Sequence, residues 1–136
     1  MTDTSTETRS IIMEREFPYP PDRIWRALTQ PQLIEEWLMK NDFQARIGHL
    51  FEFRGEWGSV SCKVLEIEPN RTLVYSWAAN GLESIVTWTL ASSPAGTSLR
   101  MEQSGFRANQ EQFYQGAKAG WPRFLASLEQ VLARMD

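Results

Sequence analysis

Apolar and polar residues alternate along most of this chain, but two stretches show the longer spacing of a helix. The first alternating stretch, Ile11 to Phe17, predicts a strand, and the run of prolines at 18, 20 and 21 ends it. Two apolar groups at helical spacing follow, separated by Pro31: Ile24, Trp25 and Leu28, then Leu33, Ile34, Trp37 and Leu38. The pattern therefore predicts two short helices between the first and second strands.

From residue 43 onward the apolar spacing is two, as in strands with one buried face. The alternating groups are Phe51 and Phe53; Val60, Cys62 and Val64; Leu73, Tyr75 and Trp77; Val86, Trp88 and Leu90; and Leu99 and Met101. Turn sequences such as Pro69-Asn70, Asn80-Gly81 and Pro94-Ala95-Gly96 separate these groups at hairpin-like distances. An antiparallel meander is the topology that this spacing favours.

The last stretch, Asn109 to Met135, carries a wide apolar stripe at helical spacing. Pro122 lies inside it, and an interior proline removes one backbone hydrogen bond and clashes with the preceding turn. The stripe keeps its phase across Pro122, since Trp121 and Leu125 are four residues apart, and this favours one kinked helix. The alternative is a main helix that begins at Trp121.

The 136 residues fit one domain, which we expect over residues 10–136 after a flexible tail of residues 1–9. A net charge of −3 with scattered basic residues argues against nucleic acid as a partner. No signal peptide or membrane-length apolar run is recognisable. The one cysteine, Cys62, alternates with valines as a buried thiol does, so we expect a cytoplasmic protein.

Several short motifs resemble the START-like (SRPBCC) superfamily, in the branch homologous to the C-terminal domain of the activator of heat shock protein 90 ATPase. They occur in matching order at Ala27-Leu28-Thr29-Gln30-Pro31, Pro69-Asn70-Arg71-Thr72-Leu73, Gly96-Thr97-Ser98-Leu99, Ser104-Gly105-Phe106, and from Gly120-Trp121 through Leu128. The resemblance spans about Ser10 to Arg134. It implies an α+β helix-grip fold, in which a curved antiparallel sheet of about six strands wraps a long C-terminal helix and leaves a cavity between them.

The sequence departs from the family pattern at two places. Ile47-Gly48 stands where members often have two glycines, and Gln103 stands where they often have a histidine before Ser-Gly-Phe. A role that rests on that histidine is therefore not expected for this chain. The full chaperone activator also has an additional N-terminal domain, for which we expect no room in 136 residues.

Polar side chains in phase with buried neighbours are the candidates for orienting a ligand, because a buried polar group must find a partner. Arg15, Tyr75 and Gln103 are such residues, and the aromatic candidates for the cavity wall are Phe51, Phe53, Trp77, Trp88, Phe113 and Trp121. The alternative for the polar three is structural: an edge ion pair, a bond to a backbone carbonyl and a frayed strand end. The aromatics in turn could fill the cavity completely.

No reacting group stands out. His49 is the one histidine and is expected to be exposed or in a hairpin, so neither a catalytic triad nor a metal site is predicted, and no cofactor is expected. Trp57, in the sequence Gly55-Glu56-Trp57-Gly58, is expected at the rim of the cavity.

Three functions follow as hypotheses. The first is a binding domain for a small hydrophobic or aromatic molecule. The second is a protein-interaction module with a chaperone partner, and the third is a cyclase-like or hydrolase-like enzyme assisted by Arg15, Tyr75 or Gln103. The sequence is compatible with a monomer or a homodimer, and it predicts neither a membrane nor a nucleic acid as a partner.

Overall fold

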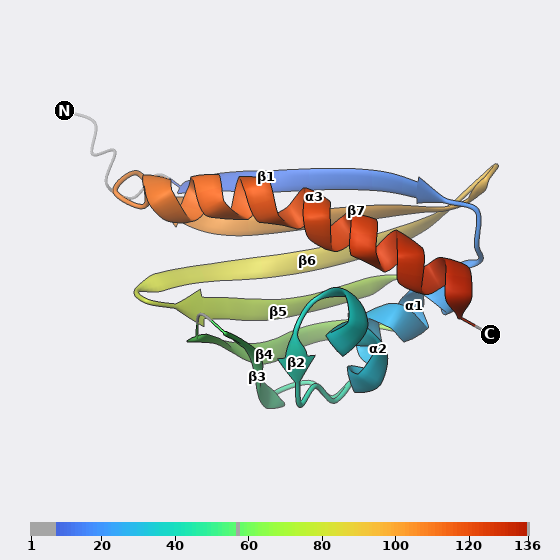
Figure 1. The fold of residues 1–136 in the computed structure, drawn as a ribbon, viewed down its shortest axis with the longest axis horizontal. Coiled ribbons are helices and arrows are strands. Elements are labelled where there is room, and N and C mark those ends of the chain that lie inside the picture. The colour runs from blue at the N-terminus through green and yellow to red at the C-terminus, as the bar shows by residue number, and fades with distance from the viewer. Residues whose placement is uncertain (1–7, 57, 136) are drawn as a thin grey trace.

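The computed structural model describes residues 8–56 and 58–135, in which one antiparallel sheet holds a long helix across one face (Figure 1). The strands are β1 (Thr8–Phe17), β2 (Lys40–Asn41), β3 (Leu50–Gly55), β4 (Gly58–Glu68), β5 (Thr72–Ala79), β6 (Leu82–Ser93) and β7 (Gly96–Arg107). Their order in the sheet is β1-β7-β6-β5-β4-β3-β2, so the first strand lies beside the last. The helices are α1 (Pro21–Thr29), α2 (Pro31–Trp37) and α3 (Glu111–Arg134).

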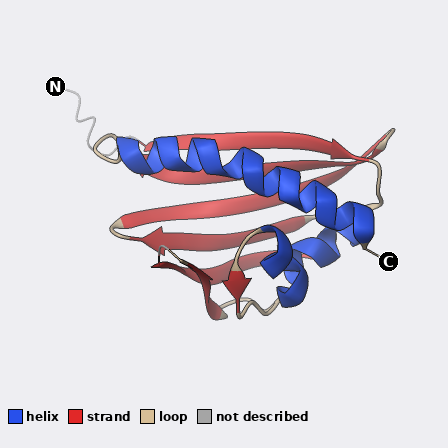
Figure 2. Cartoon of the chain, in the orientation of Figure 1, coloured by secondary structure: helices blue, strands red, loops and turns tan. Residues whose placement is uncertain are grey.

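Helices α1 and α2 form a short pair that covers one end of the sheet (Figure 2). Both begin at a proline, Pro21 and Pro31, where the fixed φ suits the first helical turn and no N–H is lost. The indole nitrogen of Trp37 donates to the carbonyl of Ala27 at 2.8 Å, which joins the two helices. The pair is therefore held by a buried hydrogen bond as well as by apolar packing.

The pairing of β1 with β7 contains a bulge at Gly105. Arg9 lies opposite Phe106 and Ser10 opposite Ser104, which leaves Gly105 as the extra residue. Gly105 has a φ of +112°, and a Cβ there would lie 2.8 Å from the carbonyl oxygen of Glu83. Glycine is thus required both by the backbone conformation and by the approach of β6.

Helix α3 is continuous through Pro122 and crosses the sheet diagonally, from the start of β1 towards α1 and α2 (Figure 1). Its buried residues are Trp121, Leu125, Leu128, Val131 and Leu132, all from Trp121 onward. The guanidinium of Arg23 in α1 donates to the carbonyls of Leu132 and Met135, which would otherwise lack helical partners. The second half of α3 is therefore fixed by the core and by α1.

The predicted α+β helix-grip architecture is confirmed, including the two early helices, the meander and the single C-terminal helix. The sheet has seven strands rather than about six, because the two-residue strand β2 pairs with β3 and has too few residues to show a period. The first strand begins at Thr8, three residues before the predicted Ile11. The alternative in which the main helix begins at Trp121 is wrong, since α3 begins at Glu111.

Of the predicted tail, residues 1–7 lie outside the described residues, while Thr8 and Arg9 belong to β1. None of the helices among the described residues is long and apolar enough to cross a membrane. The cytoplasmic location stays a prediction.

Candidate functional site: an apolar pocket under helix α3

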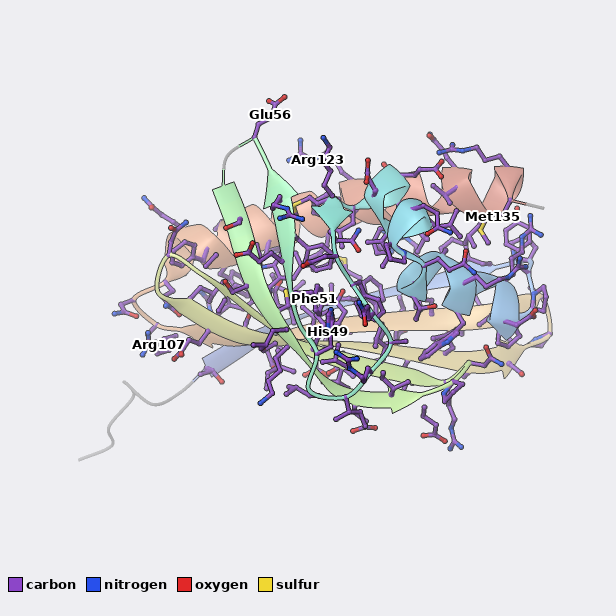
Figure 3. All side chains as sticks on the ribbon, turned by 90° about the horizontal axis from the view of Figure 1, so that it is seen from below. His49, Phe51, Glu56, Arg107, Arg123 and Met135 are labelled. Carbon is purple, nitrogen blue, oxygen red and sulfur yellow. The ribbon has the colours of Figure 1, made fainter. Side chains whose placement is uncertain are left out.

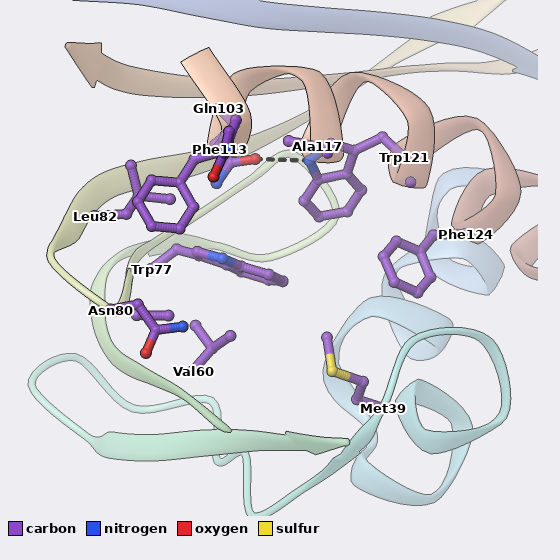
Figure 4. Close-up of a pocket in the computed structure, with 14 residues that line it drawn as sticks. Met39, Val60, Trp77, Asn80, Leu82, Gln103, Phe113, Ala117, Trp121 and Phe124 are labelled. Atoms are coloured by element: carbon purple, nitrogen blue, oxygen red, sulfur yellow. Dashed lines mark hydrogen bonds between the residues drawn. The ribbon is translucent and has the colours of Figure 1, made fainter. Parts of the chain in front are cut away.

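A pocket of about 310 Å³ lies between the sheet and the first half of α3 (Figure 4). Strands β4 to β7 supply one wall, α3 supplies the other, and the segment after α2 closes one side. The fourteen residues that line it are Met39, Val60, Trp77, Ala79, Asn80, Leu82, Gln103, Gln112, Phe113, Gly116, Ala117, Gly120, Trp121 and Phe124. This pocket lies where the helix-grip resemblance implies a cavity.

Small residues of α3 create the space. Gly116, Ala117 and Gly120 all line the pocket, and a Cβ built on Gly116 would meet no atom within 4 Å. The two glycines are four residues apart and so lie on one face of the helix. Helix backbone, rather than side chain, forms this part of the wall.

Aromatic rings from α3 and from β5 form other parts of the wall. The ring of Trp121 lies 5.5 Å from that of Trp77 and 5.6 Å from that of Phe124, in tilted and edge-on arrangements that aromatic pairs prefer. Phe113 lines the pocket from the first turn of α3 (Figure 4). These rings give the pocket flat apolar surfaces.

A chain of three buried hydrogen bonds runs along the inner wall. The indole nitrogen of Trp121 donates to Oε1 of Gln103 at 2.7 Å, and Nε2 of Gln103 donates to Oγ of Ser84 at 3.0 Å. Ser84 in turn donates to the backbone carbonyl of Trp77 at 2.8 Å. Gln103 is 1% exposed. Its side chain, from β7, is hydrogen-bonded to Trp121 of α3 and to Ser84 of β6.

The lining carries no formal charge. Its polar side chains are the neutral amides of Asn80, Gln103 and Gln112, and none of the fourteen described lining residues is acidic, basic or histidine. Among the described residues there is also no group of three or more His, Cys, Asp and Glu that could hold a metal ion.

Four of the nine predicted ligand-binding residues line this pocket: Trp77, Gln103, Phe113 and Trp121. Phe51, Phe53, Tyr75 and Trp88 do not line it, and they form the packed aromatic cluster beneath it. Ring centroids are 5.3 Å apart between Phe51 and Phe53, and 5.5 Å apart between Phe51 and Tyr75. These residues support the wall from behind.

A hydrogen bond joins Tyr75 and Trp88. The indole nitrogen of Trp88 donates to the hydroxyl of Tyr75 at 3.0 Å inside the core. Burial raises the pKa of Tyr75 well above its ordinary value, and the hydrogen bond from Trp88 offsets only part of that shift. The hydroxyl is therefore a neutral structural group.

The expectation that Arg15 faces the cavity is wrong. Arg15 is exposed, and its guanidinium donates to the backbone carbonyl of Glu14 at 2.9 Å. β1 is an edge strand, and α3 diverges from it towards α1, so the second half of β1 is not covered by that helix (Figure 1). Arg15, Tyr75 and Gln103 consequently do not converge on one polar group of a ligand.

His49 and Cys62 lie outside the pocket lining. His49 is half-buried, its Nε2 lies 2.9 Å from the carbonyl oxygen of Asp42, and its ring stacks beside Phe51 (Figure 3). Cys62 is a buried free thiol, as the alternation predicts, and burial raises its pKa far above the ordinary value. Trp57, expected at the rim, lies outside the described residues.

Sequence reasoning missed several lining residues, including Met39, Asn80 and Phe124. Met39 follows α2 and Asn80 occupies a turn, so neither belongs to a periodic pattern. A signal was nevertheless present in α3, because glycines at 116 and 120 leave one helix face without side chains. In a helix that must pack on a sheet, such a face indicates a gap.

The sheet wraps a long C-terminal helix, and an apolar pocket lies between the two. This arrangement defines a helix-grip domain of the START-like superfamily. Within it, the chain belongs to the family of activator of Hsp90 ATPase homolog 1-like proteins, whose model matches residues 18–133. No curated protein matches the chain significantly.

Solved structures of similar proteins cover nearly the whole chain. Protein MLL2253 from Mesorhizobium loti is 52% identical, with a TM-score of 0.91 over 94% of this chain and 99% of that one. CalU16 from Micromonospora echinospora is 30% identical, with a TM-score of 0.82 over 98% of this chain and 82% of that one. Protein BH1534 from Bacillus halodurans shares the fold at 24% identity, with a TM-score of 0.80 over 91% of this chain and 96% of that one.

Proposed function

We propose that this chain is a binding protein for a small hydrophobic or aromatic molecule, which occupies the pocket between the sheet and the first half of α3. The observation that carries the proposal is a preformed space of about 310 Å³ with apolar walls. Ligand sites are typically concave, largely apolar and already formed in the free protein. Family membership supports the same proposal, since the START-like resemblance implies a cavity between the sheet and the C-terminal helix.

Packing energetics give a further argument for a ligand. Protein interiors are close-packed, and a space of this size removes contacts that bulkier side chains at 116, 117 and 120 would make. Glycine inside a helix also costs about 1 kcal/mol relative to alanine. A space that lowers stability at several adjacent positions is more readily explained by an occupant than by packing.

A fluorescence titration with the neutral dye N-phenyl-1-naphthylamine tests the proposal, because its emission rises on transfer to an apolar site. We expect saturable binding by the unmodified chain. Ala117→Phe places a ring in the pocket and should lower the affinity for the dye at least about tenfold. Ala119→Phe puts the same ring on an exposed position of α3 and is the matched control.

Absence of saturable binding, or equal binding by both variants, would overturn the proposal. Native mass spectrometry of the protein purified from its own host adds a physiological test. A discrete adduct that is released on denaturation would support the proposal and give the mass of the ligand.

A protein-interaction role is the second candidate, favoured by the family match over residues 18–133. A pull-down with purified heat shock protein 90 tests it directly. If the unmodified chain and Ala117→Phe retain the chaperone equally, a surface interaction is supported. If the unmodified chain does not retain the chaperone, this candidate function is removed.

A further inference from the structure

The amide of Gln103 can adopt only one orientation in its hydrogen-bond network. An indole nitrogen always donates, so the atom of Gln103 that faces Trp121 at 2.7 Å must be the oxygen. Ser84 spends its one hydrogen on the carbonyl of Trp77, so it can only accept from Gln103. Both ends of the network therefore direct Oε1 towards α3 and Nε2 towards β6.

In this fixed orientation, one N–H of the Gln103 amide has no partner among the described residues. Nε2 carries two hydrogens, and only the bond to Ser84 uses one of them among the described residues. A carbonyl oxygen with one free lone pair is common inside proteins, but a buried N–H without a partner carries a desolvation penalty. Gln103 is almost fully buried and forms part of the pocket wall. Gln103 thus combines a place in the pocket wall with one N–H that has no partner among the described residues, and its amide is fixed by Trp121 and Ser84.

The rest of the lining restricts what can use that donor. No described lining residue is charged, so an ionised ligand would lose its hydration without gaining a counter-charge. Trp77, Trp121 and Phe124 offer flat faces and edges to an aromatic ring system.

We propose that the pocket selects uncharged aromatic molecules that carry a hydrogen-bond acceptor, such as a ketone or quinone oxygen, and that the free N–H of Gln103 binds this acceptor. The proposal rests on the proposed binding function and specifies its ligand class. Gln103 is accordingly a specificity residue, and Trp121 and Ser84 are positioning residues that fix its amide.

Two probes of nearly identical shape isolate the acceptor. In 2-acetylnaphthalene the side chain is a ketone, and in 2-isopropenylnaphthalene a methylene group replaces the oxygen. We expect displacement titrations against N-phenyl-1-naphthylamine to show about a fivefold to tenfold preference for the ketone, the value of one neutral hydrogen bond. The anion 2-naphthoate should bind at least about tenfold more weakly than the ketone.

The variant Gln103→Glu tests the residue with little disturbance. A protonated carboxyl can still accept from Trp121 and donate to Ser84, while it lacks the second donor in either protonation state. We expect this variant to lose the preference for the ketone and to bind 2-isopropenylnaphthalene within about twofold of the unmodified chain. Gln103→Met removes the amide entirely and should give the same loss.

Tyr75→Phe is the matched control, because it breaks a buried hydrogen bond of the aromatic cluster without touching the pocket lining. It should retain the full preference for the ketone. Circular dichroism spectra and thermal melts confirm that each variant is folded.

The outcomes separate the two proposals. Binding of the dye with equal affinity for both naphthalenes, or a ketone preference that survives Gln103→Glu, would overturn the role of Gln103 and leave the binding function standing. Failure of the dye and of every naphthalene to bind the unmodified chain would overturn both.

Discussion

Trp121 of α3 and Gln103 of β7 are joined by a hydrogen bond of 2.7 Å between the indole nitrogen and the amide oxygen. This bond crosses the interface between helix and sheet at the inner wall of the pocket. It links the largest ring on α3 to a buried amide that lines the pocket. The side chain of Trp121 therefore belongs both to the core and to the pocket lining.

Trp121→Ala is expected to lower the free energy of unfolding less than Trp88→Ala. Both indoles are buried and both donate a hydrogen bond, but Trp121 borders empty space and Trp88 does not line the pocket. We expect losses of about 3 kcal/mol for Trp121→Ala and about 4–5 kcal/mol for Trp88→Ala. Urea unfolding followed by far-ultraviolet circular dichroism measures both. An equal or larger loss at Trp121 would contradict the open pocket.

Tyr75→Phe is expected to destabilise the protein by about 1–3 kcal/mol, because the indole N–H of Trp88 loses its acceptor inside the core. The affinity for N-phenyl-1-naphthylamine should not change. A double-mutant cycle with Trp88→Phe checks the cause, since the second substitution should cost less once the first is present. Additive losses would show that the two side chains act independently.

Gly116→Ala is expected to stabilise the protein by about 0.5–1 kcal/mol. The added methyl group meets no atom within 4 Å, and alanine is the better helix former. Gly105→Ala provides the contrast, because its φ of +112° and the nearby carbonyl of Glu83 forbid a side chain. We expect that variant to lose more than about 1 kcal/mol. Thermal melts compare the two, and a loss at Gly116 would refute the open helix face.

Arg23→Met is expected to lower the free energy of unfolding by about 1–2 kcal/mol, because the carbonyls of Leu132 and Met135 lose a charged donor at the end of α3. The stability of Arg23→Lys should lie between those of the unmodified chain and Arg23→Met, since lysine keeps the charge but lacks the forked geometry of arginine. Arg123→Met, at an exposed position of the same helix, should stay within about 0.5 kcal/mol. Chemical denaturation gives all three values.

The thiol of Cys62 is expected to resist labelling by a disulfide reagent at about pH 8 until the protein unfolds, and to react at once in concentrated guanidinium chloride. Burial raises the pKa of the thiol, and the charges of Asp42 and Glu52 raise it further. Because the unfolded chain releases this proton first, stability should fall as the pH rises above the ordinary thiol value of 9.0. Cys62→Ala should lessen that fall, and rapid labelling of the native protein would contradict the burial.

The sequence predicted most of the fold because apolar residues alternate within the strands between Phe51 and Met101, apart from an irregularity after Val64 in β4, and the turns carry glycine, asparagine or proline. It predicted the pocket less completely. Arg15 is in phase with Ile11 and Phe17, but strand phase does not reveal how far a helix covers an edge strand. Phase likewise could not separate Trp77, which lines the pocket, from Trp88, which packs beneath it. Both distinctions depend on the path of α3 across the sheet.

A substitution at Gly116 of α3 differs from a substitution in the core. Core positions tolerate few changes of volume, because each neighbour must adjust. Gly116 is exposed and lines the pocket, and a Cβ there would meet no atom within 4 Å, so a larger residue at this position does not require the core to repack. The size of the pocket can therefore be changed from one face of α3 while the packed aromatic cluster of the core stays intact.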